Sequence, residues 1–149
     1  MLHEVRDPGN AGTVLRAADA AGADAVIFAG ESIDPFHPKV VRSTTGSLFH
    51  LPVTVAESLE AATEAARAAG LTVLAADVRG DGLLDAREEG VLRGPVAWVF
   101  GNEANGLSED DRALTDRSLR LPIYGEAESL NLATAASVLL YETAFSQRS

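Results

Sequence analysis

The sequence contains no cysteine, which excludes a disulfide scaffold and a thiolate metal site. It has no apolar run near the roughly 20 residues that span a bilayer, and no basic segment followed by an apolar one at its N-terminus. We therefore expect no membrane partner and no signal peptide, and a cytoplasmic location fits. His3, His37 and His50 show no spacing typical of metal ligands, so we expect no metal site.

Positive charge is scarce. Twelve Lys and Arg residues stand against 22 Asp and Glu residues, for a formal net charge of −10. This balance argues against non-specific nucleic-acid binding, which relies on a basic field. Net charge is a poor guide to one face, however, and a further domain could carry a basic surface. The 149 residues, 46% of them hydrophobic, indicate one globular domain with a real core.

Short apolar runs rich in β-branched residues alternate with alanine-rich segments. Several runs are apolar on both faces, as buried parallel strands are. Strands that alternate with helices predict right-handed crossovers and a parallel sheet covered on both faces, an α/β/α domain. We expect strands at 23–30, 51–56, 71–77, 95–101 and 118–123, a short first strand in "MLHEV", and helices at 11–22, 57–70 and 129–145.

Local signals set the expected boundaries of these elements. Asn10 and Gly22 are the expected N-cap and C-cap of the first helix, and Ser129 is the expected N-cap of the last. Ser108 is the expected N-cap of a short helix that begins with acidic residues. The stretch 78–95 has the composition of a loop, with a turn signal at Asp81-Gly82. Trp98 falls in a buried strand, where core packing is expected.

Three stretches contain more Gly, Asn, Ser or charged residues than an ordinary turn requires: "DPGNAGTVLR", "FGNEANGLS" and "LPIYGEAESLNLATAA". Each follows an expected strand, at the edge where open α/β sheets bind ligands. Gly101 permits close backbone approach there, and we expect Gly106 to be left-handed. None of the stretches is a Walker A loop or a G-x-G-x-x-G motif, so phosphate binding has no support. Read singly, each stretch could also be an ordinary capped helix or loop.

Together, the three stretches resemble the SpoU-type (TrmH family) RNA 2′-O-ribose methyltransferases of the SPOUT class. The matching motifs are "NAGTVLR", "GNEANGL" and "PIYGEAESLNLATAA", in the family's order and spacing. The resemblance covers essentially the whole chain. It departs from the family at Leu132, where valine is frequent.

The resemblance implies a fold, a cofactor and partners. The fold would be a parallel-sheet α/β/α domain with a deep C-terminal trefoil knot, and the cofactor would be S-adenosylmethionine. The substrate would be ribosomal or transfer RNA, and a homodimer would build each active site at its interface. Residues 1–149 would form a single SPOUT domain that lacks an N-terminal RNA-binding domain, which fits the truncated first strand.

The resemblance also implies roles for particular residues. Arg16 would be the catalytic arginine, assisted by Asn10, Glu103, Ser129 and Asn131. The cofactor pocket would be lined, largely through backbone atoms, by Gly101, Leu121 and Leu130, and flanked by Ile123 and Ser129.

The implied reaction is in-line attack of a ribose 2′-hydroxyl on a sulfonium methyl group. Arginine is a poor base because its pKa lies above about 12. We therefore expect Arg16 to hold the adjacent phosphate and to stabilise developing alkoxide charge. A phosphate oxygen, a water molecule or Glu103 would take the proton, and the sequence leaves these three open.

The sequence leaves other interpretations open. A non-catalytic RNA- or nucleotide-binding module could keep the fold, although Arg16, Glu103 and Asn131 argue against it. A nucleotide hydrolase would need a phosphate loop or an acid pair, which the sequence lacks. An enzyme of antibiotic resistance and a housekeeping enzyme would show the same motifs. Residues 42–44 either contact RNA phosphates or begin a solvated helix.

Overall fold

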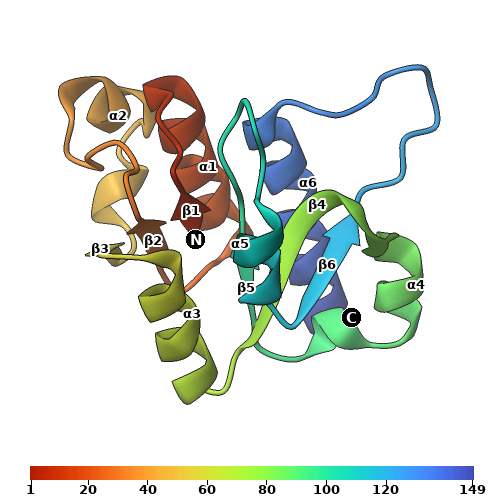
Figure 1. The fold of residues 1–149 in the computed structure, drawn as a ribbon. Helices are drawn as coiled ribbons and strands as arrows, with labels where there is room; N and C mark the ends of the chain where they lie inside the picture. Colours follow the sequence, from red (N-terminus) through yellow and green to blue (C-terminus); the bar gives the residue numbers. More distant parts are fainter.

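The computed structural model describes residues 1–149, and six parallel strands form its centre. One group has the order β1-β2-β3 and the other the order β5-β4-β6. A parallel bridge between Leu2 and Phe100 joins the groups, with the His3 amide donating to the Phe100 carbonyl at 2.8 Å. The strands are β1 (Leu2–His3), β2 (Val26–Ala29), β3 (Val53–Ala56), β4 (Thr72–Gly82), β5 (Val96–Val99) and β6 (Arg117–Arg120), as Figure 1 shows.

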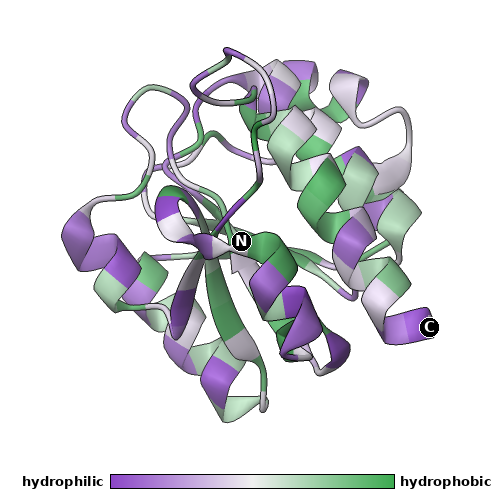
Figure 2. Cartoon of the chain, turned by 90° about the vertical axis from the view of Figure 1, so that its right-hand side faces the viewer, coloured by the Kyte–Doolittle hydropathy of each residue, from purple (hydrophilic) through white to green (hydrophobic).

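Helices cover both faces of the sheet, which confirms the α/β/α prediction. In β4, Leu74 packs into a cluster with residues of α1 and α6, whereas Val73 and Ala75 pack with residues of α3. This alternation follows the two-residue period of a strand. The helices are α1 (Pro8–Ala21), α2 (Pro38–Ser43), α3 (Leu59–Ala68), α4 (Leu83–Glu88), α5 (Glu109–Ala113) and α6 (Leu132–Arg148), with 3-10 turns η1 (Ser47–Phe49) and η2 (Val91–Arg93). Figure 2 shows the helices carrying both hydrophilic and hydrophobic segments.

Trp98 lies in the core, as predicted. It is 4% exposed, stacks on Phe100, and donates its indole N–H to Thr143 Oγ1 at 2.9 Å. A buried indole N–H needs such a partner, because an unmade hydrogen bond in the core is costly. None of the helices is both long enough and apolar enough to cross a membrane.

Two predicted N-caps are wrong. Helix α1 begins at Pro8, and the Asp7 carboxylate caps it by accepting from the Asn10 amide at 2.7 Å. Proline suits the first helical position because it has no N–H to leave unpaired, so the helix starts before Asn10. Helix α6 begins at Leu132, and its cap is Asn131 instead of Ser129. The C-cap at Gly22, with φ 81°, and the N-cap at Ser108 are confirmed.

The stretch 78–95 is more regular than predicted. Strand β4 continues to Gly82, with a register shift between Ala76 and Asp81, so no turn forms at Asp81-Gly82. Helix α4 and η2 follow. Gly80 makes this path possible, since a Cβ there would collide with the backbone of Ser118 on β6.

Candidate active site

A cavity of about 370 Å³ opens at the carboxyl ends of β4, β5 and β6. Its wall comes from the ends of these strands, the loop between β5 and α5, and the loop before α6. This edge is where open α/β sheets bind ligands. All of the predicted cofactor residues line the cavity: Gly101, Leu121, Ile123, Ser129 and Leu130.

Glycine and asparagine shape the cavity wall in the loop after β5. A Cβ at Gly101 would lie 2.6 Å from the carbonyl carbon of Gly106, so the loop closes tightly only around glycine. Gly106 has φ 64°, the left-handed conformation predicted for it. Asn102 fixes the turn, because its Oδ1 accepts from the amides of Ala104 and Asn105 at 2.9 and 3.2 Å.

Two side chains tie this loop to the loop after β1. The Asn102 Nδ2 group donates to the carbonyl of Glu4 at 2.9 Å. The Glu103 carboxylate accepts from the amides of Asp7 and Arg6 at 3.1 and 3.4 Å. Glu103 is therefore bound by backbone donors directly before α1, while it also lines the cavity.

The first and third motifs meet beside the cavity. Asn131 Nδ2 donates to Asn10 Oδ1 at 3.1 Å, although 121 positions separate the two residues. The Asn131 Oδ1 atom accepts from the amides of Ala133 and Thr134, which caps α6. One amide group thus both starts α6 and holds the beginning of α1 against it, next to Ser129 and Leu130.

Arg16 lies apart from this assembly. It is exposed on α1, has no ion pair or side-chain hydrogen bond, and is absent from the cavity wall. It lies six positions after Asn10, about 9 Å along the helix axis. Within one copy of the chain, the structure brings together the predicted site residues with the exception of Arg16.

The comparisons with known proteins agree with this geometry. Residues 1–141 match the SpoU rRNA Methylase family. The chain is a member of this family.

Relatives within the SpoU family are longer than this chain. The chain is 38% identical over 141 residues to the 23S rRNA (guanosine(2553)-2′-O)-methyltransferase RlmP of Bacillus subtilis, covering 95% of this chain and 55% of that protein. It is 43% identical over 138 residues to a 23S rRNA (uridine(2479)-2′-O)-methyltransferase of Streptomyces viridochromogenes, covering 91% of this chain and 48% of that protein. The chain therefore spans about half the length of these relatives.

A solved SpoU structure has the same fold. It is the SpoU methyltransferase AviRb from Streptomyces viridochromogenes in complex with the cofactor AdoMet, with a TM-score of 0.84 and 40% identity. The match covers 99% of this chain and 59% of that chain.

Sequence reasoning missed an ion pair in the wall of the SpoU cavity. Arg79 donates to both carboxylate oxygens of Asp77, at 2.8 and 2.7 Å, and to the carbonyl of Leu107 at 2.6 Å. The Asp77 side chain is 4% exposed, and the Arg79 hydrogen bonds hold the pKa of that carboxyl below its ordinary value. An acid directly after the apolar run "LTVLAA" was the available signal.

A larger cavity, about 630 Å³, lies at the opposite edge of the sheet. Met1 lines it together with the first residues of β2 and β5, and mostly alanine and aliphatic side chains complete the wall. The Met1 amino group donates to the carbonyl of Trp98 at 2.6 Å, and burial lowers its pKa to about 5. None of the predicted site residues lies there. No group of three His, Cys, Asp or Glu side chains is arranged to hold a metal ion.

Proposed function

We propose that this chain is the catalytic domain of an S-adenosylmethionine-dependent methyltransferase that acts on a ribose 2′-hydroxyl of ribosomal or transfer RNA. The observation that carries the proposal is the convergence of three distant motifs on one strand-end cavity. Gly101 and Leu130 line that cavity, and Asn131 beside it holds Asn10. The names of the two curated relatives support the same reaction. An enzyme of this kind would work in the cytoplasm.

The residues of the cavity fit S-adenosylmethionine. Small-molecule sites measure about 300–1,000 Å³, are mostly apolar, and carry a few polar groups that fix orientation. The cavity of about 370 Å³ meets these conditions, with Leu121, Ile123 and Leu130 as apolar wall and Asp77 and Glu103 as acids. Ile123 and Leu130 are 37% and 41% exposed, so their side chains are available to contact a bound cofactor. The cofactor supplies a methyl group already activated on a cationic sulfur.

We propose that the active unit is a homodimer in which Arg16 of one protomer serves the cavity of the other. Arg16 lies outside the cavity of its own chain, which supports the view that it acts at the cavity of a second copy. Helix α6 packs against the helix that bears Arg16, and it exposes an apolar stripe. Val138, Tyr141 and Phe145 in this stripe are 45%, 39% and 61% exposed, at the spacing of one helix face.

In the proposed mechanism, the chain positions the reactants and stabilises charge. Holding two groups in line can contribute roughly 7–11 kcal/mol to the barrier reduction. The Asn10–Asn131 pair keeps the starts of α1 and α6 together at the reacting end of the cavity. The Arg16 guanidinium holds the phosphate and stabilises negative charge on the 2′-oxygen as it forms. The Glu103 carboxylate already accepts hydrogen bonds from two backbone amides, so we assign it the role of positioning the loop. A phosphate oxygen or a water molecule would then take the proton of the 2′-hydroxyl.

We also propose that this domain belongs to a longer protein with an N-terminal RNA-binding domain, and that its C-terminal part forms a deep trefoil knot. The length of the relatives supports the first point. Family membership supports the knot.

Two measurements test the proposed function. Calorimetric titration of the purified chain with S-adenosylmethionine should show saturable binding, whereas no binding at millimolar concentration would favour a non-catalytic module. Mass-spectrometric mapping of 2′-O-methyl groups in ribosomal and transfer RNA, from cells with and without the gene, should reveal one missing modification. An unchanged map in both RNA classes would reject the reaction.

A further inference from the structure

We propose that the surface formed by the exposed residues between positions 36 and 50 binds single-stranded RNA beside Arg16. We call it the 36–50 surface. Lys39 and Arg42 contact phosphates, and Phe49 stacks on a base. This inference rests on the proposed function, since it assumes an RNA substrate, and it adds the part of the domain that holds that RNA.

The charge of this surface differs from that of the rest of the chain. All 22 acidic residues lie outside 35–56, although the net charge is −10. Lys39 and Arg42 are exposed on α2, and neither forms an ion pair, whereas most arginines of the chain do. Asp19 of α1 packs on this segment, but Ser47 and His50 engage its carboxylate. Lys39 and Arg42 form no ion pair and can neutralise phosphates, which is the main source of affinity for nucleic acids.

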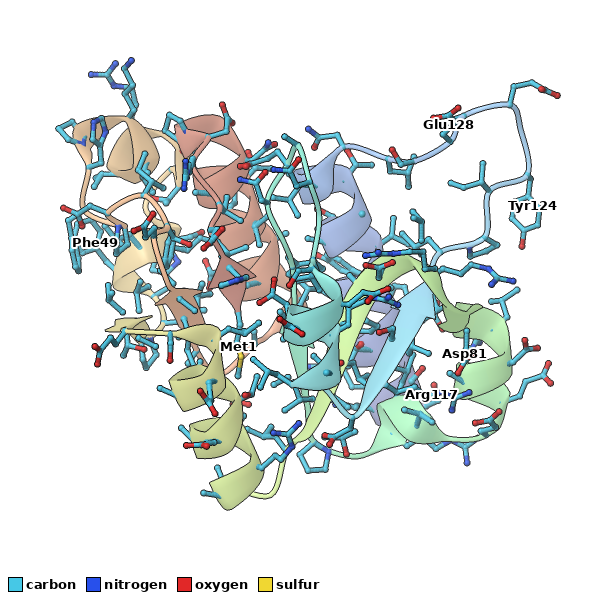
Figure 3. The ribbon with its side chains drawn as sticks, in the orientation of Figure 1. Met1, Phe49, Asp81, Arg117, Tyr124 and Glu128 are labelled. Atoms are coloured by element: carbon cyan, nitrogen blue, oxygen red, sulfur yellow. The ribbon has the colours of Figure 1, made fainter.

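Aromatic rings stand out from the same surface. Phe49 is 81% exposed and Phe36 is 62% exposed. Figure 3 shows Phe49 at the outer edge of the molecule. The backbone of Phe49 is held in η1, where its amide donates to the carbonyl of Gly46 at 3.1 Å, so the ring projects from an ordered turn. Exposed aromatic rings on ordered backbone are the platforms on which unpaired bases stack.

Arg16 lies on the face of α1 that packs beside the 36–50 surface. Gly12, Arg16 and Asp19 share one face of α1, at the spacing i, i+4 and i+7. A Cβ at Gly12 would collide with Ser43, and Ser47 Oγ donates to Asp19 Oδ2 at 2.7 Å. Residues 43–47 therefore run along the face of α1 that carries Arg16. An RNA strand held by α2 and η1 would continue to the guanidinium proposed for catalysis.

The structure also decides which residues of the segment 42–44 can reach RNA. The Thr44 side chain is fully buried. Ser43 Oγ donates to the carbonyls of Pro8 and Val40 at 3.0 and 2.9 Å. These residues end α2 and join it to α1, so the predictions of phosphate contacts and of a solvated helix start are wrong for them. Arg42 alone keeps an available side chain.

RNA fits this surface better than a protein does. A protein partner would have to pair or desolvate both cations when it covered the rings, at an energetic cost. Single-stranded RNA supplies phosphates for Lys39 and Arg42 and a base face for Phe49 at once.

The test measures binding of a fluorescein-labelled oligouridylate RNA by fluorescence anisotropy over a series of salt concentrations. Each phosphate contact on a single strand contributes about 0.7 to the slope of log K against log salt, so the K39Q/R42Q double variant should reduce the slope by about 1.4. Phe49→Ala should weaken binding about 5- to 150-fold at fixed salt, because a stacked base contributes that factor. The matched control is Arg93→Gln, which removes the charge of another exposed, unpaired arginine and should leave both quantities unchanged.

Calorimetry with S-adenosylmethionine and light scattering accompany each variant. Unchanged cofactor affinity with the expected losses in RNA binding supports the 36–50 surface. A wild-type chain that binds cofactor but not the oligouridylate overturns it, as do variants that bind RNA like the wild type. A change of subunit mass in the variants would identify a protein interface and would also overturn it. Failure of the wild-type chain to bind cofactor would instead reject the proposed function.

Discussion

Acetylation of the Met1 amino group should stabilise the isolated chain in a pH-dependent manner. Burial lowers the pKa of this group to about 5 from its ordinary value of 8.0. The unfolded chain therefore binds a proton that the folded chain releases between these pH values. Stability rises with pH wherever the unfolded state binds more protons, so the amino group costs stability below pH 8.

The size of the effect follows from the shift. Each pKa unit corresponds to 1.36 kcal/mol, so a fall from 8.0 to about 5 costs about 4 kcal/mol near pH 5 and nothing above pH 8. An acetyl group removes the charge and keeps an N–H for the Trp98 carbonyl. The adjacent cavity of about 630 Å³ has room for it.

Urea unfolding followed by fluorescence measures the difference, because Trp98 is the single tryptophan and is buried. The free energy of unfolding of the acetylated chain should exceed that of the free chain by about 4 kcal/mol near pH 5, and the two should converge above pH 8. The two chains share every other titratable group, so the contributions of those groups to the pH dependence cancel in the difference between the two unfolding free energies. An equal difference at both pH values would refute the assignment of the cost to a buried ammonium.

Three further predictions concern the site. Arg16→Ala should abolish methyl transfer and leave cofactor affinity within a few-fold, as measured by calorimetry, because this side chain lies outside the cavity wall; lost cofactor binding would contradict that division of roles. Gly101→Ala should destabilise the chain by about 1–3 kcal/mol and weaken cofactor binding, because its Cβ would lie 2.6 Å from facing backbone. Gly125→Ala is the control, since a Cβ at that position would meet no other atom within 4 Å. If both variants lost equal cofactor affinity in calorimetry and equal stability in urea unfolding, the steric explanation would be wrong. Asn131→Ser should keep a helix cap but have a side chain too short to bond Asn10, so activity should fall while the melting temperature holds; Asn131→Ala should lose both, with a stability cost of about 0.5–2 kcal/mol.

The periodicity of the sequence was enough to predict the layers of the fold. Apolar runs with both faces buried, such as "LTVLAA", become central strands, and alanine-rich segments become the covering helices. The signals fail at element boundaries. Asn10 and Asn131 both have cap chemistry, yet only Asn131 caps a helix, because Pro8 and Asp7 begin α1 earlier.

The sequence by itself determined which residues could serve a ligand, because glycines that permit close approach and asparagines that bond to backbone are local properties. Only the tertiary structure decided how they meet. The bond between Asn10 and Asn131 and the hold of Glu103 on the amides before α1 join positions about a hundred residues apart, which local signals do not encode. The same packing leaves Arg16 exposed on α1 and outside the cavity of its own chain.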